Sequence, residues 1–331
     1  MCVSALTKET IAIDPNLKAA EAELLRFTES GGRLILYFDI NKTLIAEDSA
    51  SLKTEETLLN NILSQYYKAC WDENISEAIT FYEYVKNHLY PGSKQDIETK
   101  NTWTKLSGEF IQWLQKERHP LYQTVKDHYQ RLSNHIGKEK IFSSFFRMID
   151  LIEKCQCRAN IVLRSFGDDI QKTIRRIESH NSKWKFTFIA KAEKGQFATS
   201  ENKTLSPIQL FRTLNEHSFS AIQDDYNYWH KSPHCEQFQY GKAFLFDETS
   251  PKKHCIFFDD HINIKPSYPK NIVAPISTKN GTLNEDTLDA LIKKNQLIQV
   301  DTIQAIENPN YYTDKIIDSL RVFLNSIEYS L

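Results

Sequence analysis

The stretch RLILYFDINKTLIAED, residues 33–48, joins a continuous apolar run to an aspartate, an asparagine and a threonine. An unbroken apolar run of this length is typical of a strand that is buried on both faces of a parallel sheet. Asp39 stands where that strand should end, and a carboxylate in such a place needs a partner. Residues 33–38 are therefore predicted to form a strand, and Asp39 is a candidate functional residue.

The segments around this strand predict an α/β protein. Asp14-Pro15 is a good helix start, and Gly31-Gly32 is a good helix end. After residue 150, strand patterns such as ANIVLR, KWKFTFIA, HCIFFDD, NIVAPI and QLIQV alternate with helix patterns such as GDDIQKTIRRIESH and IQLFRTLNEH. This alternation predicts a doubly wound, mostly parallel sheet.

Residues 49–150 have a different character. Apolar residues recur at helical spacing through TEETLLNNILSQYYKACW, ISEAITFYEYVKNHLY, TWTKLSGEFIQWLQKE and LYQTVKDHYQRLSNHI. We expect a helical insertion at 49–150 in a discontinuous core of 1–48 and 151–331. Most of its aromatic residues are expected to pack inside it.

Composition excludes several classes of protein. The formal net charge is -2, so no overall basic field attracts nucleic acid. Glycine is sparse, with 9 residues, and neither G-x-G-x-x-G nor G-x-x-x-x-G-K-[ST] occurs. We find no apolar run of membrane-spanning length and no signal peptide, and the six scattered cysteines are typical of a reducing compartment. These features predict a cytoplasmic protein without membrane insertion, and export without a cleaved signal would look the same.

Polar residues follow three of the predicted strands. Asp39 ends the first, Ser165 ends ANIVLRS, and Asp259 and Asp260 end CIFFDD; Lys242 lies between the last two segments. Because ligands bind beyond the carboxyl ends of parallel strands, these side chains are expected to converge.

This combination resembles the haloacid dehalogenase (HAD) superfamily. Its motifs are an apolar strand with D-x-D-x-[TV], a strand ending in Ser or Thr, a lysine, and a strand ending in an acidic pair. The matching segments are LILYFDINKT, NIVLRS, YGK and CIFFDD, in that order. Asp39 and Ser165 are 126 positions apart (165 minus 39), and in this superfamily a helical module in that interval is a C1-type cap.

The resemblance implies a phosphohydrolase that acts through an aspartyl-phosphate on Asp39. A carboxylate nucleophile divides a difficult hydrolysis into two steps. The implied cofactor is Mg²⁺, held by Asp39, the backbone carbonyl of Asn41 and Asp259, with Asp260 supporting the site through water or Lys242.

The resemblance also implies the phosphate-binding groups. Ser165 and the backbone N–H of Phe166 would hold phosphate oxygens, and Lys242 would neutralise the nucleophile and the phosphate. Taken singly, Ser165 reads as a helix N-cap and Lys242 as a solvated lysine. The other lysines that compete for its role are Lys231, Lys252 and Lys253.

Asn41 departs from the family pattern, in which the second acid protonates the leaving group and activates water. General acid–base catalysis contributes about 10²–10⁴-fold, so an amide here weakens turnover without abolishing it. Glu47, Asp48 or a histidine of the cap or of residues 217–254 could substitute. On the sequence alone, Asn41→Asp is expected to raise turnover.

Three interpretations remain open at this point. The first is a Mg²⁺-dependent phosphatase or phosphotransferase that favours good leaving groups. The second is a weak or inactive member that binds a phosphorylated ligand or a protein partner. The third, a metal-free dehalogenase-like hydrolase, is disfavoured by the acidic pair at 259–260. The substrate would be a phosphorylated small molecule or a phosphoprotein, and the oligomeric state is not readable.

Two further segments carry weaker predictions. Residues 217–254 are read as a long irregular loop, whose His230, His234 and Cys235 are poorly spaced for a metal site. The segment 300–331 is expected to end in an amphipathic helix that docks on the core.

Overall fold

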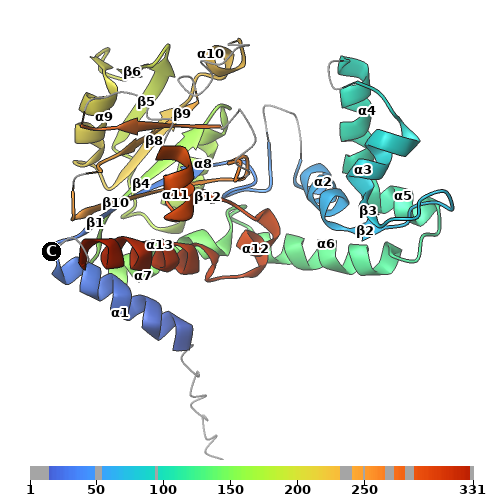
Figure 1. The fold of residues 1–331 in the computed structure, drawn as a ribbon, viewed down its shortest axis with the longest axis horizontal. Helices are drawn as coiled ribbons and strands as arrows, with labels where there is room; N and C mark the ends of the chain where they lie inside the picture. Colours follow the sequence, from blue (N-terminus) through green and yellow to red (C-terminus); the bar gives the residue numbers. More distant parts are fainter. Residues whose placement is uncertain are drawn as a thin grey trace, which may run out of the picture.

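The computed structural model describes residues 15–48, 54–93, 96–231, 241–248, 250–264, 272–279 and 287–328. Within them, the largest sheet has eight strands (Figure 1). Neighbours from β12 to β5 run parallel, and β6 and β7 add an antiparallel edge, which confirms the predicted α/β fold with a mostly parallel sheet. In sheet order the strands are β12 (Leu297–Gln299), β10 (Lys253–Asp259), β1 (Arg33–Asp39), β4 (Arg158–Ser165), β8 (Phe219–Gln223), β5 (Phe188–Glu193), β6 (Gln196–Thr199) and β7 (Thr204–Leu205).

Strand β1 lies inside this sheet, between β10 and β4. All of its residues after Arg33 are buried, as the unbroken apolar run predicts. The Phe38 ring stacks on that of its β10 partner Phe258, with centroids 4.8 Å apart. The carboxyl ends of β10, β1 and β4 are therefore adjacent at one edge of the sheet.

The two faces of the sheet are covered differently. Five helices pack on one face, and two helices together with the parallel pair β9–β11 pack on the other. The helices of the first face are α1 (Pro15–Glu29), α7 (Ser143–Lys154), α8 (Asp169–His180), α12 (Thr302–Glu307) and α13 (Tyr311–Glu328). The second face carries α9 (Pro207–Leu214), α11 (Leu288–Lys293), β9 (Lys242–Phe246) and β11 (Val273–Ser277).

The ends of the chain follow the sequence prediction where they are described. Helix α13 contacts α1, α7 and β10, so the C-terminal helix does dock on the core. Gly31 has a positive φ of 77° just after α1, a conformation that suits glycine. Asp14, the predicted cap of α1, lies outside the described residues.

The helical insertion lies to one side of the sheet (Figure 1). Its Phe81 and Phe110 rings stack with centroids 4.5 Å apart, and Trp71 meets Phe81 at 5.3 Å, so these aromatics form a core as predicted. The insertion contains α2 (Glu55–Tyr66), β2 (Lys68–Ala69), β3 (Ile79–Thr80), α3 (Phe81–Tyr84), the π-helix η1 (Val85–Leu89), α4 (Ile97–Gly108), α5 (Phe110–Lys116) and α6 (Tyr122–Ile136).

The domain boundary expected at residue 150 falls inside α7, which packs against the sheet. Phe145 of this helix meets Phe38 edge-to-face at 5.3 Å, and Ser144 donates a hydrogen bond of 2.5 Å to the carbonyl of Ala305 in α12.

The reading of residues 217–254 as irregular is wrong for the part that the structure describes. This part contains β8, α10 (Tyr226–Lys231) and β9. The sequence hides β8 because FSAIQ is short and places the polar Ser220 in a fully buried position. Residues 232–240, with His234 and Cys235, lie outside the described residues.

Candidate functional site

Three side chains from distant parts of the chain meet at the carboxyl edge of the sheet. Asp39 ends β1, Asp259 ends β10, and Lys242 begins β9. All three are buried, with exposed fractions of 6% for Asp39, 0% for Asp259 and 2% for Lys242. The predicted convergence of these residues is confirmed.

The Lys242 ammonium group bridges the two carboxylates. Its Nζ donates to Asp39 Oδ1 and, at 2.7 Å, to Asp259 Oδ2. Burial alone would lower the pKa of Lys242, but Asp259 and Asp39 outweigh burial and raise it. The lysine is therefore held as a cation between two acids.

Asp39 itself is difficult to ionise in this arrangement. Burial raises its pKa to about 7, and the neighbouring Asp259 and Asp260 raise it further, while Lys242 opposes them. Additional positive charge close to Asp39 would favour its carboxylate form, which is the nucleophilic form.

Asp260 lies beside this cluster but has partners of its own. Its carboxylate accepts from Lys42 Nζ at 3.3 Å and lies 2.8 Å from His261 Nδ1. Burial would raise the pKa of Asp260, but Lys42 and His261 outweigh burial and lower it to about 2. The direct partners of Asp260 are thus Lys42 and His261, rather than Lys242 as the resemblance implied.

The loop after Asp39 is fixed by many backbone contacts. Lys42 has a positive φ of 57°, and its N–H donates to the Ile45 carbonyl at 2.8 Å. Thr302 donates to the Lys42 carbonyl at 2.7 Å, and the Tyr312 hydroxyl donates to the Thr43 carbonyl. These contacts hold the D-x-N-x-T segment in one shape at the strand end.

The Asn41 side chain is turned toward α8. Its Nδ2 donates to Asp169 Oδ2 and to the Glu47 carbonyl, both at 2.8 Å. Glu47 is bound in turn by Lys172 and Arg176, and although burial would raise its pKa, their hydrogen bonds lower it. These ion pairs make Glu47 a poor candidate for the missing proton donor.

Ser165 and Phe166 lie between β4 and α8. The Ser165 hydroxyl accepts from the Gly167 N–H at 3.0 Å, so it shapes this loop rather than capping α8, which begins at Asp169. The Phe166 ring lies over Lys242, with Nζ 5.2 Å from the ring centroid. The two predicted phosphate-binding positions thus flank the lysine.

Arg164 and Asp224 were missed by the sequence analysis. The Arg164 guanidinium donates to both Asp224 oxygens, at 3.1 Å and 2.5 Å, and to the Ala243 carbonyl at 2.5 Å. Asp224 follows β8 and raises the pKa of Lys242 further, after Asp259 and Asp39. Recognising β8 as a strand would have pointed to Asp224, because Asp224 follows its carboxyl end.

The donor set suits a hard divalent cation. Ligand atoms of Asp259, Asp260 and His261 lie within 4.8 Å of one another, and Asp39 shares Lys242 with Asp259. Carboxylate oxygens are ligands that Mg²⁺ prefers. A cation between Asp39 and Asp259 would compete with the lysine for the same two carboxylates.

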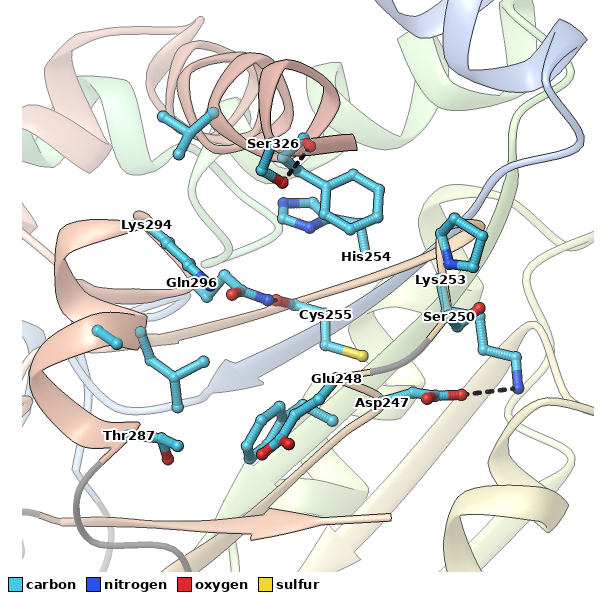
Figure 2. A pocket seen from close by; sticks show the side chains of 16 residues that line it. Asp247, Glu248, Ser250, Lys253, His254, Cys255, Thr287, Lys294, Gln296 and Ser326 are labelled. Carbon is cyan, nitrogen blue, oxygen red and sulfur yellow. Dashed lines mark hydrogen bonds and ion pairs between the residues drawn. The ribbon is translucent and has the colours of Figure 1, made fainter. Parts of the chain in front are cut away.

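Two cavities help to locate the accessible surface. One of about 840 Å³ borders the site and is lined by Phe166, Asp224, Gln223, Tyr226 and Lys191, among others. Another of about 620 Å³ lies at the opposite edge of the sheet, where the side chains drawn in Figure 2 include His254 and Cys255 at the start of β10. The lining of this second cavity includes none of the predicted site residues.

Comparison with known proteins finds no matching family model, no matching curated protein and no matching solved structure. Among the described residues, no helix has the length and apolar character that crossing a bilayer requires.

Proposed function

We propose that this protein is a HAD-like, Mg²⁺-dependent phosphatase or phosphotransferase that forms an aspartyl-phosphate on Asp39. The observation that carries the proposal is the buried cluster of Asp39, Lys242 and Asp259, which three distant segments bring together at the carboxyl edge of the sheet. In this proposal the helical insertion serves as a C1-type cap.

The first step is an attack by an Asp39 carboxylate oxygen on phosphorus. The bond from phosphorus to the leaving-group oxygen breaks, and that oxygen keeps the electron pair. Lys242 balances the charge of the nucleophile and of the phosphoryl oxygens. The Ser165 hydroxyl and the Phe166 N–H would bind the phosphoryl oxygens.

The second step releases the phosphate. Water attacks phosphorus, the acyl phosphate bond breaks, and Asp39 is restored as orthophosphate leaves. Asp39, Asp259, Asp260 and the backbone carbonyl of Asn41 would hold Mg²⁺, which would supply positive charge for the carboxylates and the phosphoryl group.

The bonds of Asn41 favour substrates with acidic leaving groups. Both of its amide protons are engaged by Asp169 and Glu47, and an amide does not exchange a proton at neutral pH. Aryl and acyl phosphates are therefore the expected class, as small molecules or, for acyl phosphates, on proteins, because their leaving groups depart without a proton.

Steady-state hydrolysis of p-nitrophenyl phosphate, with Mg²⁺ and with EDTA, tests this function. We expect Mg²⁺-dependent turnover that Asp39→Asn lowers by about 10³-fold or more. The control is Asp150→Asn on the exposed surface of α7, which should leave turnover unchanged. Turnover that is unaffected by Asp39→Asn would contradict the proposal.

The alternative is a weak or inactive HAD-like protein that binds a phosphorylated ligand or a protein partner. The same bonds of Asn41 favour it, because the amide supports binding geometry without proton transfer. Mg²⁺-dependent binding of orthophosphate without turnover of aryl or acyl phosphates would select this alternative.

A further inference from the structure

The Asn41 amide group faces two hydrogen-bond acceptors. One is the carboxylate of Asp169 and the other is the backbone carbonyl of Glu47, each 2.8 Å from Nδ2. A single nitrogen with two protons satisfies both acceptors at once. The side-chain orientation follows from these partners, because the amide oxygen in the same place would meet two acceptors.

A carboxylate at position 41 would fit badly in this place. One of its oxygens would face the Glu47 carbonyl and the Asp169 carboxylate with no proton to share between them. Asp169 is only 2% exposed, so solvent would screen little of the repulsion. The geometry therefore selects an amide and excludes the second acid of the family pattern.

The Asn41–Asp169 bond also joins the two loops that form the site. Asn41 lies two residues after Asp39, and Asp169 is the first residue of α8, four residues after Ser165 (169 minus 165). Glu47 binds the same helix through Lys172, so the nucleophile loop is attached to α8 at two places.

We propose that Asn41 and Asp169 form a positioning pair, which fixes the loop carrying Asp39 against the loop carrying Ser165. The pair acts through those residues and takes no part in proton transfer. The inference rests on the proposed function in its account of the site, but the bond itself can be tested without turnover. It reverses the expectation from sequence: Asn41→Asp damages the site instead of restoring an acid.

The test compares the effect of Asn41→Asp in the native protein and in the Asp169→Asn background. In the native protein we expect a midpoint of thermal unfolding several degrees lower and an affinity for orthophosphate, measured with Mg²⁺ by calorimetry, at least tenfold weaker. In the Asp169→Asn background the amide of residue 169 can donate to the new carboxylate. There, both effects should be smaller, although the Glu47 carbonyl still lacks its donor.

Asn60→Asp in α2 is the matched control. Asn60 is 5% exposed, and its Nδ2 donates to the Glu56 carbonyl at 3.0 Å. The same chemical change should lower the unfolding midpoint there, leave orthophosphate affinity unchanged and gain nothing from Asp169→Asn. This separates a loss of positioning from a general loss of stability.

Equal effects of Asn41→Asp in both backgrounds would overturn the pair, as would a variant with higher turnover and an unchanged unfolding midpoint. If the native protein neither hydrolyses phosphate esters nor binds orthophosphate, the proposed function fails. A difference in unfolding midpoint between the two backgrounds would still support the positioning pair in that case.

Discussion

Lys242 is the residue on which the charge balance of the site depends. Asp39 and Asp259 are buried with it, and each would be costly to hold ionised without a cation. Its place at the start of β9, outside the main sheet, explains why the sequence gives little warning of its contacts. A glycine before it and an acidic pair after it were the available signals.

His254 is a buried histidine far from this cluster, at the other end of β10. Its Nε2 lies 2.8 Å from Ser319 Oγ, its ring lies 4.5 Å from that of Phe323, and its Nδ1 has no partner among the described residues. Burial lowers its pKa from 6.5 to about 3. The folded protein therefore holds this ring neutral through the mildly acidic range.

This histidine should make the protein sensitive to acid. The unfolded chain takes up a proton near pH 6.5 and the folded one only near pH 3, so the stabilisation is complete above pH 6.5 and is lost as the pH falls toward 3. In urea unfolding, His254→Gln should reduce the loss of unfolding free energy between pH 7 and pH 4 by about 3 kcal/mol. The exposed His135→Gln should leave it unchanged, and an unaltered pH dependence in His254→Gln would refute the assignment.

At the scale of elements, the Arg164–Asp224 pair ties three strands together. Arg164 belongs to β4, Asp224 follows β8, and the guanidinium also donates to the carbonyl of Ala243 in β9. Because β9 is hydrogen-bonded to β11 and not to the main sheet, this contact helps to hold the strand that carries Lys242 over the site.

Breaking this pair should be strongly destabilising. Arg164→Met leaves Asp224 as a buried carboxylate without its guanidinium partner, and such a loss typically costs about 3–5 kcal/mol. Urea unfolding should show this decrease, whereas Arg175→Met on the exposed side of α8 should change stability by less than about 0.5 kcal/mol. A loss in Arg164→Met as small as that of the control would show that the pair does not hold these strands.

The elements that the sequence predicts well are those whose pattern is set by burial. Strands β1, β4 and β10 are unbroken apolar runs because neighbouring strands and both covering layers bury them. Strand β8 is short and contains a buried serine, so neither its pattern nor the role of Asp224 stands out. The partners of Asn41 could not be predicted, because they depend on how α8 packs beside the loop.

For the whole molecule, the order of strands decides which residues meet. The parallel order β10-β1-β4 brings Asp259, Asp39 and Ser165 to one edge, which follows from the sequence once a parallel sheet is assumed. The contact between the insertion and the core does not follow in this way. One such contact places His128 of α6 3.2 Å from Glu307 of α12, and no periodicity in either helix indicates it.

The central claim is that Asp39 is phosphorylated during turnover and that Asn41 cannot assist the release of phosphate. The most direct test is acid quenching during turnover of a ³²P-labelled aryl phosphate with Mg²⁺, followed by peptide mapping. Because the second step lacks a general base, the phosphoenzyme should accumulate, and the label should lie on the peptide that contains Asp39 and be absent from Asp39→Asn. Rapid turnover without any labelled protein, or a label that persists in Asp39→Asn, would contradict the account.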